Sequence, residues 1–159
     1  MNQTRIQLDH GATMPTRAHE SDVGYDVTAC KVEYCNCMDE PAGDDDKVYS
    51  VKIDTGVHVT PPEGYHFELM ANSRLAKTGF HIPNGLGLID PDYTGSIRML
   101  LRGYEDIDYV KTMFAPGKVC GQLVLRKTHS TEFIPVDKLH ETQRGNGGFG
   151  STEKKGDQA

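Results

Sequence analysis

The chain has 159 residues, of which 36% are apolar and 8% are aromatic, and it contains no Trp. This length allows one domain with a hydrophobic core but hardly two. So low an apolar content is typical of chains with flexible tails or with a core shared between subunits. The formal net charge of −6 argues against a general nucleic-acid-binding protein, because phosphate backbones attract basic surfaces. It permits a small anionic ligand in a local positive pocket.

The chain shows no sign of a targeting segment or a membrane span. No N-terminal apolar run precedes a small-residue cleavage site, and no apolar stretch approaches the length of a span. The four cysteines, at positions 30, 35, 37 and 120, are few and unevenly spaced for a disulfide framework, and they lack the paired spacing of most zinc sites. We therefore expect an intracellular, cytoplasmic protein with reduced thiols, or a nuclear or host-cell one if the source is eukaryotic or viral.

Short β-type segments separated by turn residues dominate the chain. Alternating or branched apolar residues predict strands at 5–8, 48–53, 65–69, 97–101 and 119–125. One helical turn is expected at 73–77, and the acidic segment 39–46 is expected to form an exposed loop. This pattern predicts an all-β barrel or jelly roll over residues 1–140. Residues 141–159 are polar and rich in Gly, and we expect them to form a flexible C-terminal arm.

The segment from Ile89 to Gly95 has turn chemistry between two apolar strands. Its sequence Asp-Pro-Asp-Tyr-Thr-Gly predicts a hairpin. Asp90 lies next to a strand interior, where a lone carboxylate is costly unless it has a function. An ordinary turn in which Asp90 bonds its own backbone is the alternative.

The segment from Arg144 to Thr152 contains the spacing G-x-G-x-x-G. No strand precedes it and no helix follows it, so it does not predict a dinucleotide-binding fold. Free backbone amides can wrap a phosphate, and the ring of Phe149 can cover a base. A disordered polar tail is the alternative interpretation.

Two further segments carry weaker signals. Ser73 begins the predicted helical turn, whose N-terminus would attract an anion, and Arg74 adds positive charge. Asp26 lies in the sequence Val-Gly-Tyr-Asp-Val and could hold a magnesium ion through water, since magnesium keeps several waters. The alternative for the segment at Ser73 is a capped surface turn. The alternative for the segment at Asp26 is a turn at the start of a strand.

Taken together and in this order, these segments resemble the five motifs of the trimeric dUTPase family. Val23–Val27 is similar to A-G-Y-D-L, and Asn72–Ala76 to R-S-G/S-L-A. Gly87–Gly95 fits G-x-I-D-x-x-Y-x-G, and Arg144–Thr152 fits R-G-x-G-G-F-G-S-T at every defined position. Gly117–Leu123 is a degraded form of G-D-R-I-A-Q-L. The resemblance implies a distorted jelly-roll barrel with one short helix and a C-terminal arm that closes over the active site.

The resemblance also implies an activity and an assembly. Members of this family hydrolyse dUTP to dUMP and pyrophosphate with Mg²⁺, by water attack on the α-phosphorus. The reaction limits uracil incorporation into DNA and supplies dUMP for dTMP synthesis. The implied assembly is a homotrimer with three active sites shared between subunits, and neither nucleic acid nor a membrane is an implied partner.

The family's residue roles fall on matching positions of this chain. Asp90 would orient and activate the attacking water, Tyr93 would lie against the deoxyribose and exclude a 2′-hydroxyl, and Asp26 would hold magnesium through water. The backbone around the predicted hairpin would read the uracil edge, and the phosphates would be bound by side chains of three motifs. The implied uracil-binding positions are Asn84, Gly87 and Ile89; the implied phosphate-binding positions are Ser73, Arg74 and Gln122; and the implied arm residues are Arg144, Phe149, Gly150, Ser151 and Thr152.

The second motif departs from the family pattern and keeps alternatives open. Asn72 stands where the family has Arg, and Arg74 stands where it has Gly or Ser. We hypothesise that Arg74 supplies the missing charge, although its side chain could instead point away from the site. One rival function is a weakly catalytic nucleotide-binding or signalling protein on this scaffold. Another is a dCTP deaminase-like enzyme, against which the complete arm motif argues.

Overall fold

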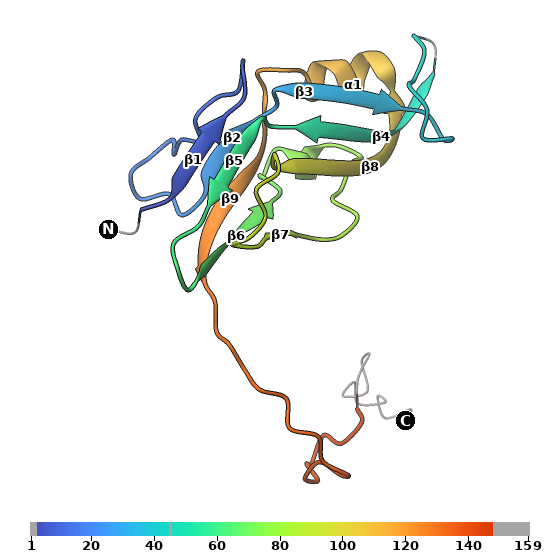
Figure 1. Ribbon diagram of the computed structural model, residues 1–159. Coiled ribbons are helices and arrows are strands. Elements are labelled where there is room, and N and C mark those ends of the chain that lie inside the picture. Colours follow the sequence, from blue (N-terminus) through green and yellow to red (C-terminus); the bar gives the residue numbers. More distant parts are fainter. Residues whose placement is uncertain (1–2, 45, 148–159) are drawn as a thin grey trace, which may run out of the picture. The chain divides into compact units, whose positions relative to one another are not determined.

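The computed structural model, shown in Figure 1, describes residues 3–44 and 46–147. The chain divides into a unit of residues 1–129 and a unit of residues 130–159, and each is described by itself. Every strand and helix of the described residues lies in the first unit. In chain order these are β1 (Arg5–Leu8), β2 (Tyr25–Thr28), β3 (Lys31–Cys35), β4 (Lys47–Asp54), β5 (Val57–Thr60), β6 (Tyr65–Met70), a 3₁₀ turn η1 (Leu75–Lys77), β7 (Gly87–Ile89), β8 (Arg98–Asp106), α1 (Ile107–Met113) and β9 (Val119–Lys127).

The strands form three antiparallel sheets. β1 pairs with β5, the second sheet has the order β2-β9-β6-β7, and the third has the order β3-β4-β8. In Figure 1, α1 lies beside the β3-β4-β8 sheet, and it contacts β4 and β8. The architecture confirms the predicted all-β, jelly-roll fold class.

The core lies between these sheets and follows from the alternation of the strands. In β4, Val48, Val51 and Ile53 are buried while Lys52 is partly exposed. Val57 in β5 is also fully buried. Burying each such side chain stabilises the fold by about 1.5–3 kcal/mol. The five predicted strands all coincide with observed strands, the one expected at 97–101 starting one residue later at Arg98.

Helix placement differs from the prediction. The expected turn at 73–77 contains only the 3₁₀ turn η1, and an unpredicted seven-residue helix, α1, follows β8. Ile107 and Val110 of α1 are buried, and Phe114 after its end packs edge-to-face on Phe80 with ring centroids 5.4 Å apart. A segment this short shows too few periods for its sequence to reveal a helix, and tertiary packing decides its conformation.

The segment after β7 is a turn, as predicted, but it is not a hairpin. Asp90 O accepts a hydrogen bond from Tyr93 N at 3.1 Å, which closes the turn. β7 pairs with β6, however, and β8 pairs with β4, so the flanking strands belong to different sheets. Residues 90–96, which we name the 90–96 turn, lie between β7 of the four-stranded sheet and β8 of the three-stranded sheet.

The described part of the second unit, residues 130–147, contains no strand or helix. Its four large apolar side chains, between 61% and 90% exposed, are Phe133, Ile134, Val136 and Leu139. Such a segment buries too little surface to fold alone. Neither helix in the described part of the chain reaches the length and hydropathy of a membrane span.

Candidate active site

Asp26 and Gln122 form a cross-strand pair between the edge strand β2 and its neighbour β9 in the four-stranded sheet. Antiparallel pairing of β2 with β9 places the two residues opposite each other. Gln122 Nε2 donates to Asp26 Oδ1 at 2.9 Å, and both side chains are half-buried. A Cβ atom at Gly24 would lie 3.1 Å from the Gln122 side chain, so the glycine leaves room for the amide. Among the described residues, only Oδ1 of this carboxylate has a hydrogen-bond partner, and the pair thus presents an oriented carboxylate to other ligands.

Ser73 lies in the loop that follows the strand next to this pair. On β9, Gln122 also faces Met70 of β6, and Ser73 follows Met70 by three residues. Asn72 Oδ1 accepts a hydrogen bond from Leu75 N at 3.3 Å, which holds the start of η1. The Asn at this position therefore shapes the loop, while the Ser73 side chain is exposed to solvent.

The Arg74 side chain turns toward the end of α1. Its Nη2 atom donates a hydrogen bond to the carbonyl oxygen of Met113, and its charge lies close enough to Cys120 to lower the pKa of that thiol. Burial outweighs this effect and raises the pKa of Cys120 to about 12, so the thiol stays protonated. A cation at a helix C-terminus is stabilising. The geometry supports a packing role for Arg74, which is the second of the two orientations considered from sequence.

We expect Arg74→Ala to destabilise the protein by about 1–3 kcal/mol, because it leaves a partly buried carbonyl unpaired. The kcat value should stay within about threefold of the wild type, since the guanidinium already has a partner. Urea unfolding and steady-state turnover measure the two effects. Lys77→Ala, which alters an exposed cation of the same loop, is the matched control. A large fall in kcat at unchanged stability would show instead that Arg74 binds the phosphates.

The 90–96 turn fixes the backbone at Asp90 and leaves the Asp90 and Tyr93 side chains accessible. Asp90 follows the buried Ile89 and is exposed. Tyr93 is 41% exposed, and its hydroxyl donates to Ser96 O at 2.7 Å. A Cβ at Gly95 would lie 2.6 Å from that hydroxyl oxygen, so only glycine lets the ring fold over the turn. One face of the Tyr93 ring is thereby held on the turn.

The three implied uracil-binding residues lie on the segment that leads into this turn. Asn84 Nδ2 donates to Leu86 O at 3.1 Å, Gly87 pairs with Leu69, and Ile89 pairs with Phe67. Asn84 and Gly87 line a cavity of about 480 Å³, a volume typical of small-molecule sites. The other lining residues are Leu69, Ile82, Pro83, Arg98, Met99 and Leu100. Neither Asp90 nor Tyr93 lines this cavity.

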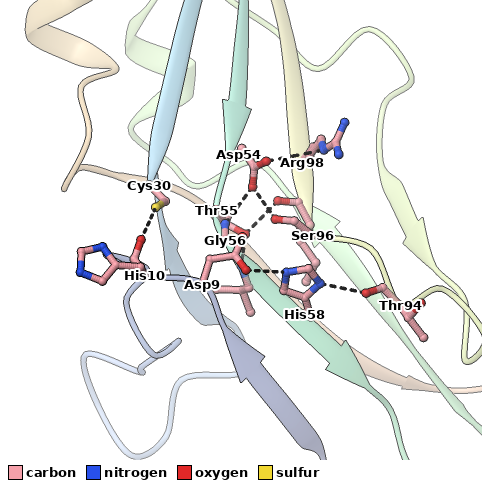
Figure 2. Close-up of polar contacts among 12 residues, drawn as sticks. Asp9, His10, Cys30, Asp54, Thr55, Gly56, His58, Thr94, Ser96 and Arg98 are labelled. Carbon is pink, nitrogen blue, oxygen red and sulfur yellow. Dashed lines mark hydrogen bonds and ion pairs between the residues drawn. The ribbon is translucent and has the colours of Figure 1, made fainter.

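A polar network fixes the end of the 90–96 turn to the neighbouring strands, as Figure 2 shows. The buried Thr55 donates its hydroxyl to Ile97 O at 2.8 Å, and the Ser96 hydroxyl donates to Asp54. Burial raises the pKa of Asp54, but the hydrogen bonds from Ser96 and from the Gly56 amide, with the nearby positive charges, outweigh it and lower the pKa. Asp54 therefore remains an acceptor at neutral pH.

His58 joins the same network from β5. Its Nδ1 atom lies 2.8 Å from Thr94 O, and its Nε2 atom lies 3.2 Å from Asp9 Oδ1. The hydrogen bond to the Thr94 carbonyl raises the pKa of His58, and the Asp9 carboxylate raises it further against the opposing effect of burial. No motif pointed to His58 or Asp9, because their meeting depends on the register of β1 against β5.

The predicted arm residues belong to the second unit. Arg144 is exposed, and its Nε donates to Gly147 O at 2.9 Å. The predicted positions Phe149, Gly150, Ser151 and Thr152 lie outside the described residues. Within one chain, Asp26 and Gln122 contact each other, and Asn84 and Gly87 line one cavity. Arg74 instead contacts the carbonyl oxygen of Met113.

Comparison with known proteins identifies the scaffold. The dUTPase family model matches residues 10–153. The deoxyuridine 5'-triphosphate nucleotidohydrolase of Escherichia phage T5 is 35% identical over 154 residues, covering 95% of this chain and 99% of that one. The Staphylococcus bacteriophage 80alpha dUTPase with dUPNHPP superposes with a TM-score of 0.71 at 23% identity, covering 96% of this chain and 99% of that chain.

A second solved structure concerns the coordination of a metal ion. A mutant dUTPase from phage phi11 of S. aureus, described for the coordination of a structural Mg(II) ion, superposes with a TM-score of 0.63 at 22% identity. It covers 86% of this chain and 98% of that chain. At this identity the likeness concerns the fold. The family model, the full-length relative and the five ordered motifs agree, and this chain belongs to the dUTPase family.

Proposed function

We propose that this chain hydrolyses dUTP to dUMP and pyrophosphate by attack of water on the α-phosphorus. The observation that carries the proposal is the 90–96 turn, which presents an exposed Asp90 beside a Tyr93 ring held to Ser96 O at 2.7 Å. An accessible carboxylate on a fixed backbone can hold a water and accept its proton. Family membership supplies the substrate class, since the phage T5 relative is named a deoxyuridine 5'-triphosphate nucleotidohydrolase.

The remaining residues position the triphosphate and neutralise its charge. Phosphoryl transfer depends on positioning and electrostatic stabilisation more than on covalent chemistry. Ser73 and Gln122 would donate hydrogen bonds to the phosphate chain. Arg144, Ser151 and Thr152 would bind the γ-phosphate, with Gly150 letting the backbone approach. Asp90 would then activate the attacking water.

Asp26 fits the part of a magnesium ligand. Its half-buried carboxylate is oriented by Gln122 through Oδ1. A single carboxylate suits an ion that retains most of its waters and binds substrate phosphates. Within residues 3–44 and 46–147, no group of three or more acidic, His or Cys side chains forms a metal site. Bound with the triphosphate, Mg²⁺ would neutralise phosphate charge, and Asp26 would contact it through water.

Base and sugar selection would follow from rigid groups around the 90–96 turn. The backbone near Asn84, Gly87 and Ile89 would hydrogen-bond the uracil edge, and Phe149 would cover the base. Cytosine presents a donor where uracil presents an acceptor, and leaving buried polar groups unpaired makes that mismatch costly. Tyr93 would lie against the deoxyribose and leave no space for a 2′-hydroxyl. The 480 Å³ cavity lined by Asn84 and Gly87 supports the placement of the uracil at these two residues.

A homotrimer with shared sites accounts for the distribution of these residues. Asp26 and Gln122 lie on the β2-β9 pair, whereas Asn84 lines a cavity bounded by β8 residues. The exposed apolar side chains of residues 133–139 also require a partner surface. We infer that each site combines these surfaces from different subunits with an arm from another subunit. With reduced thiols and a nucleotide substrate, we expect the enzyme to act in the cytoplasm, or in the nucleus or a virus-infected cell.

The decisive experiment compares substrates. Pyrophosphate release should be fast with dUTP and Mg²⁺, at least about 10²-fold slower with dCTP and UTP, and lost when EDTA removes the metal. Ammonia release from dCTP would identify a deaminase instead. Tight dUTP binding with negligible turnover would identify the rival nucleotide-binding protein. Either result would overturn the proposal.

A further inference from the structure

We propose that His58 is a positioning residue for substrate binding, which holds the 90–96 turn through the Thr94 carbonyl and is itself held by Asp9. The inference rests on the proposed placement of Tyr93 against the substrate. The Thr94 carbonyl belongs to the Thr94–Gly95 peptide, so holding it restrains the chain between Tyr93 and Ser96, whose carbonyl oxygen accepts the hydrogen bond of the Tyr93 hydroxyl. His58 lies on β5, outside every motif that resembles the family's.

Both ring nitrogens of His58 face acceptors. Nδ1 lies 2.8 Å from Thr94 O, and Nε2 lies 3.2 Å from Asp9 Oδ1 (Figure 2). Neither acceptor can donate a proton. A neutral imidazole carries one N–H and satisfies one acceptor, whereas an imidazolium satisfies both. The geometry therefore favours the protonated ring, with one charge-assisted bond to each partner.

On balance, the charged groups around His58 also favour the protonated ring. Asp9 comes from the end of β1, and Asp54 of β4 adds a second carboxylate that raises the pKa of His58. Arg5 of β1 lines the same hollow as His58 and opposes these carboxylates, and Arg98 of β8 lies 3.7 Å from Asp54. The hydrogen bond to Thr94 O is the largest cause of the raised pKa.

The sign of the pH effect follows from this arrangement. Because the folded protein raises the pKa of His58, the clamp is complete below the ordinary histidine pKa of about 6.5. It is lost as pH rises through the raised pKa. Loss of the second proton leaves one of the two contacts without a hydrogen. Either the bond to the Thr94 carbonyl is lost, or the ring loses its anchor to Asp9 and holds that carbonyl less tightly. In both cases the Tyr93 ring becomes less well placed for the deoxyribose.

The first test separates KM from kcat in the full-length protein. We expect His58→Ala to raise the KM for dUTP about five- to tenfold at about pH 6, below the ordinary histidine pKa, with kcat within about twofold. This is the effect of losing one charge-assisted hydrogen bond. The ratio of the variant's KM to the wild-type KM should fall toward one as the pH becomes alkaline. His58→Gln, which keeps one uncharged donor, should restore part of the affinity without the pH dependence. Ionisation of dUTP itself affects all variants equally.

A second variant and a second measurement keep the inference testable if His58→Ala folds poorly. Asp9→Asn should move the rise in KM to lower pH, because it removes a carboxylate that favours the imidazolium. In a nitrogen-15 NMR titration without nucleotide, the Gly95 amide, which follows the Thr94 carbonyl, should shift together with the His58 ring. If the Gly95 amide signal does not shift as His58 titrates, the inference is overturned, regardless of the activity of the variants. If that shift occurs but Asp90→Asn remains active, the proposed site is wrong and the clamp stands.

Discussion

We expect the replacement of Asp90 by Asn to lower kcat for dUTP by about 10³-fold, the effect of removing a general base. The amide keeps the size and hydrogen-bonding reach of the carboxylate but cannot take a proton from the attacking water. KM should change by less than about threefold, because the triphosphate contacts remain. Rapid-quench measurement of pyrophosphate release gives the rate of the chemical step.

The same turn supplies the matched control for Asp90. Asp92 is an exposed acid two residues along, between the same strands. Asp92→Asn removes the same charge from the same turn, so any general electrostatic effect on the anionic substrate appears in both variants. We expect the Asp92 variant to stay within about threefold of the wild type. Equal losses in the two variants would mean that Asp90 acts by charge alone.

The strands could be predicted from sequence because their signal is local. The alternation in residues 65–69 repeats within the strand, and one buried face enforces the pattern. In residues 48–53 the apolar residues still indicate a strand, although a register shift between Val48 and Ser50 interrupts the alternation. The pairing of β7 with β6 and of β8 with β4 could not be predicted, since turn chemistry at Asp90–Gly95 fits a hairpin equally well. Which sheet a strand joins is decided by long-range packing.

The residues of the candidate site could be predicted where they belong to sequence motifs. Contacts that depend on strand register or on side-chain rotamers could not be predicted. Asp26 and Gln122 come from separate motifs, and the contact between them follows from the β2-β9 register. The direction of Arg74 depends on an acceptor, Met113 O, in a helix that the sequence did not reveal. His58 and Asp9 are joined across β5 and the end of β1 without any local signal.

Removing residues 144–159 should lower kcat/KM for dUTP by about 10³-fold or more. The truncation deletes the proposed γ-phosphate and uracil contacts, and each preorganised donor on developing charge contributes about 10²–10³-fold. The melting temperature should hardly change, because every strand and helix of the described residues lies before residue 130. Removing only residues 153–159 spares the motif and is the matched control. Circular dichroism melts and steady-state kinetics measure the two properties.

Mixing two inactive variants tests whether the arm serves a neighbouring subunit. Asp90→Asn subunits carry an intact arm, and truncated subunits carry an intact Asp90. In a mixed trimer, some sites combine the Asp90 of a truncated subunit with the arm of its neighbour, so activity should return after the two are unfolded and refolded together. If each arm closed over the Asp90 of its own chain, every site in the mixture would lack one component. Persistent inactivity would thus assign the arm to its own subunit, since each chain would then have to supply both the carboxylate and the groups that bind the γ-phosphate.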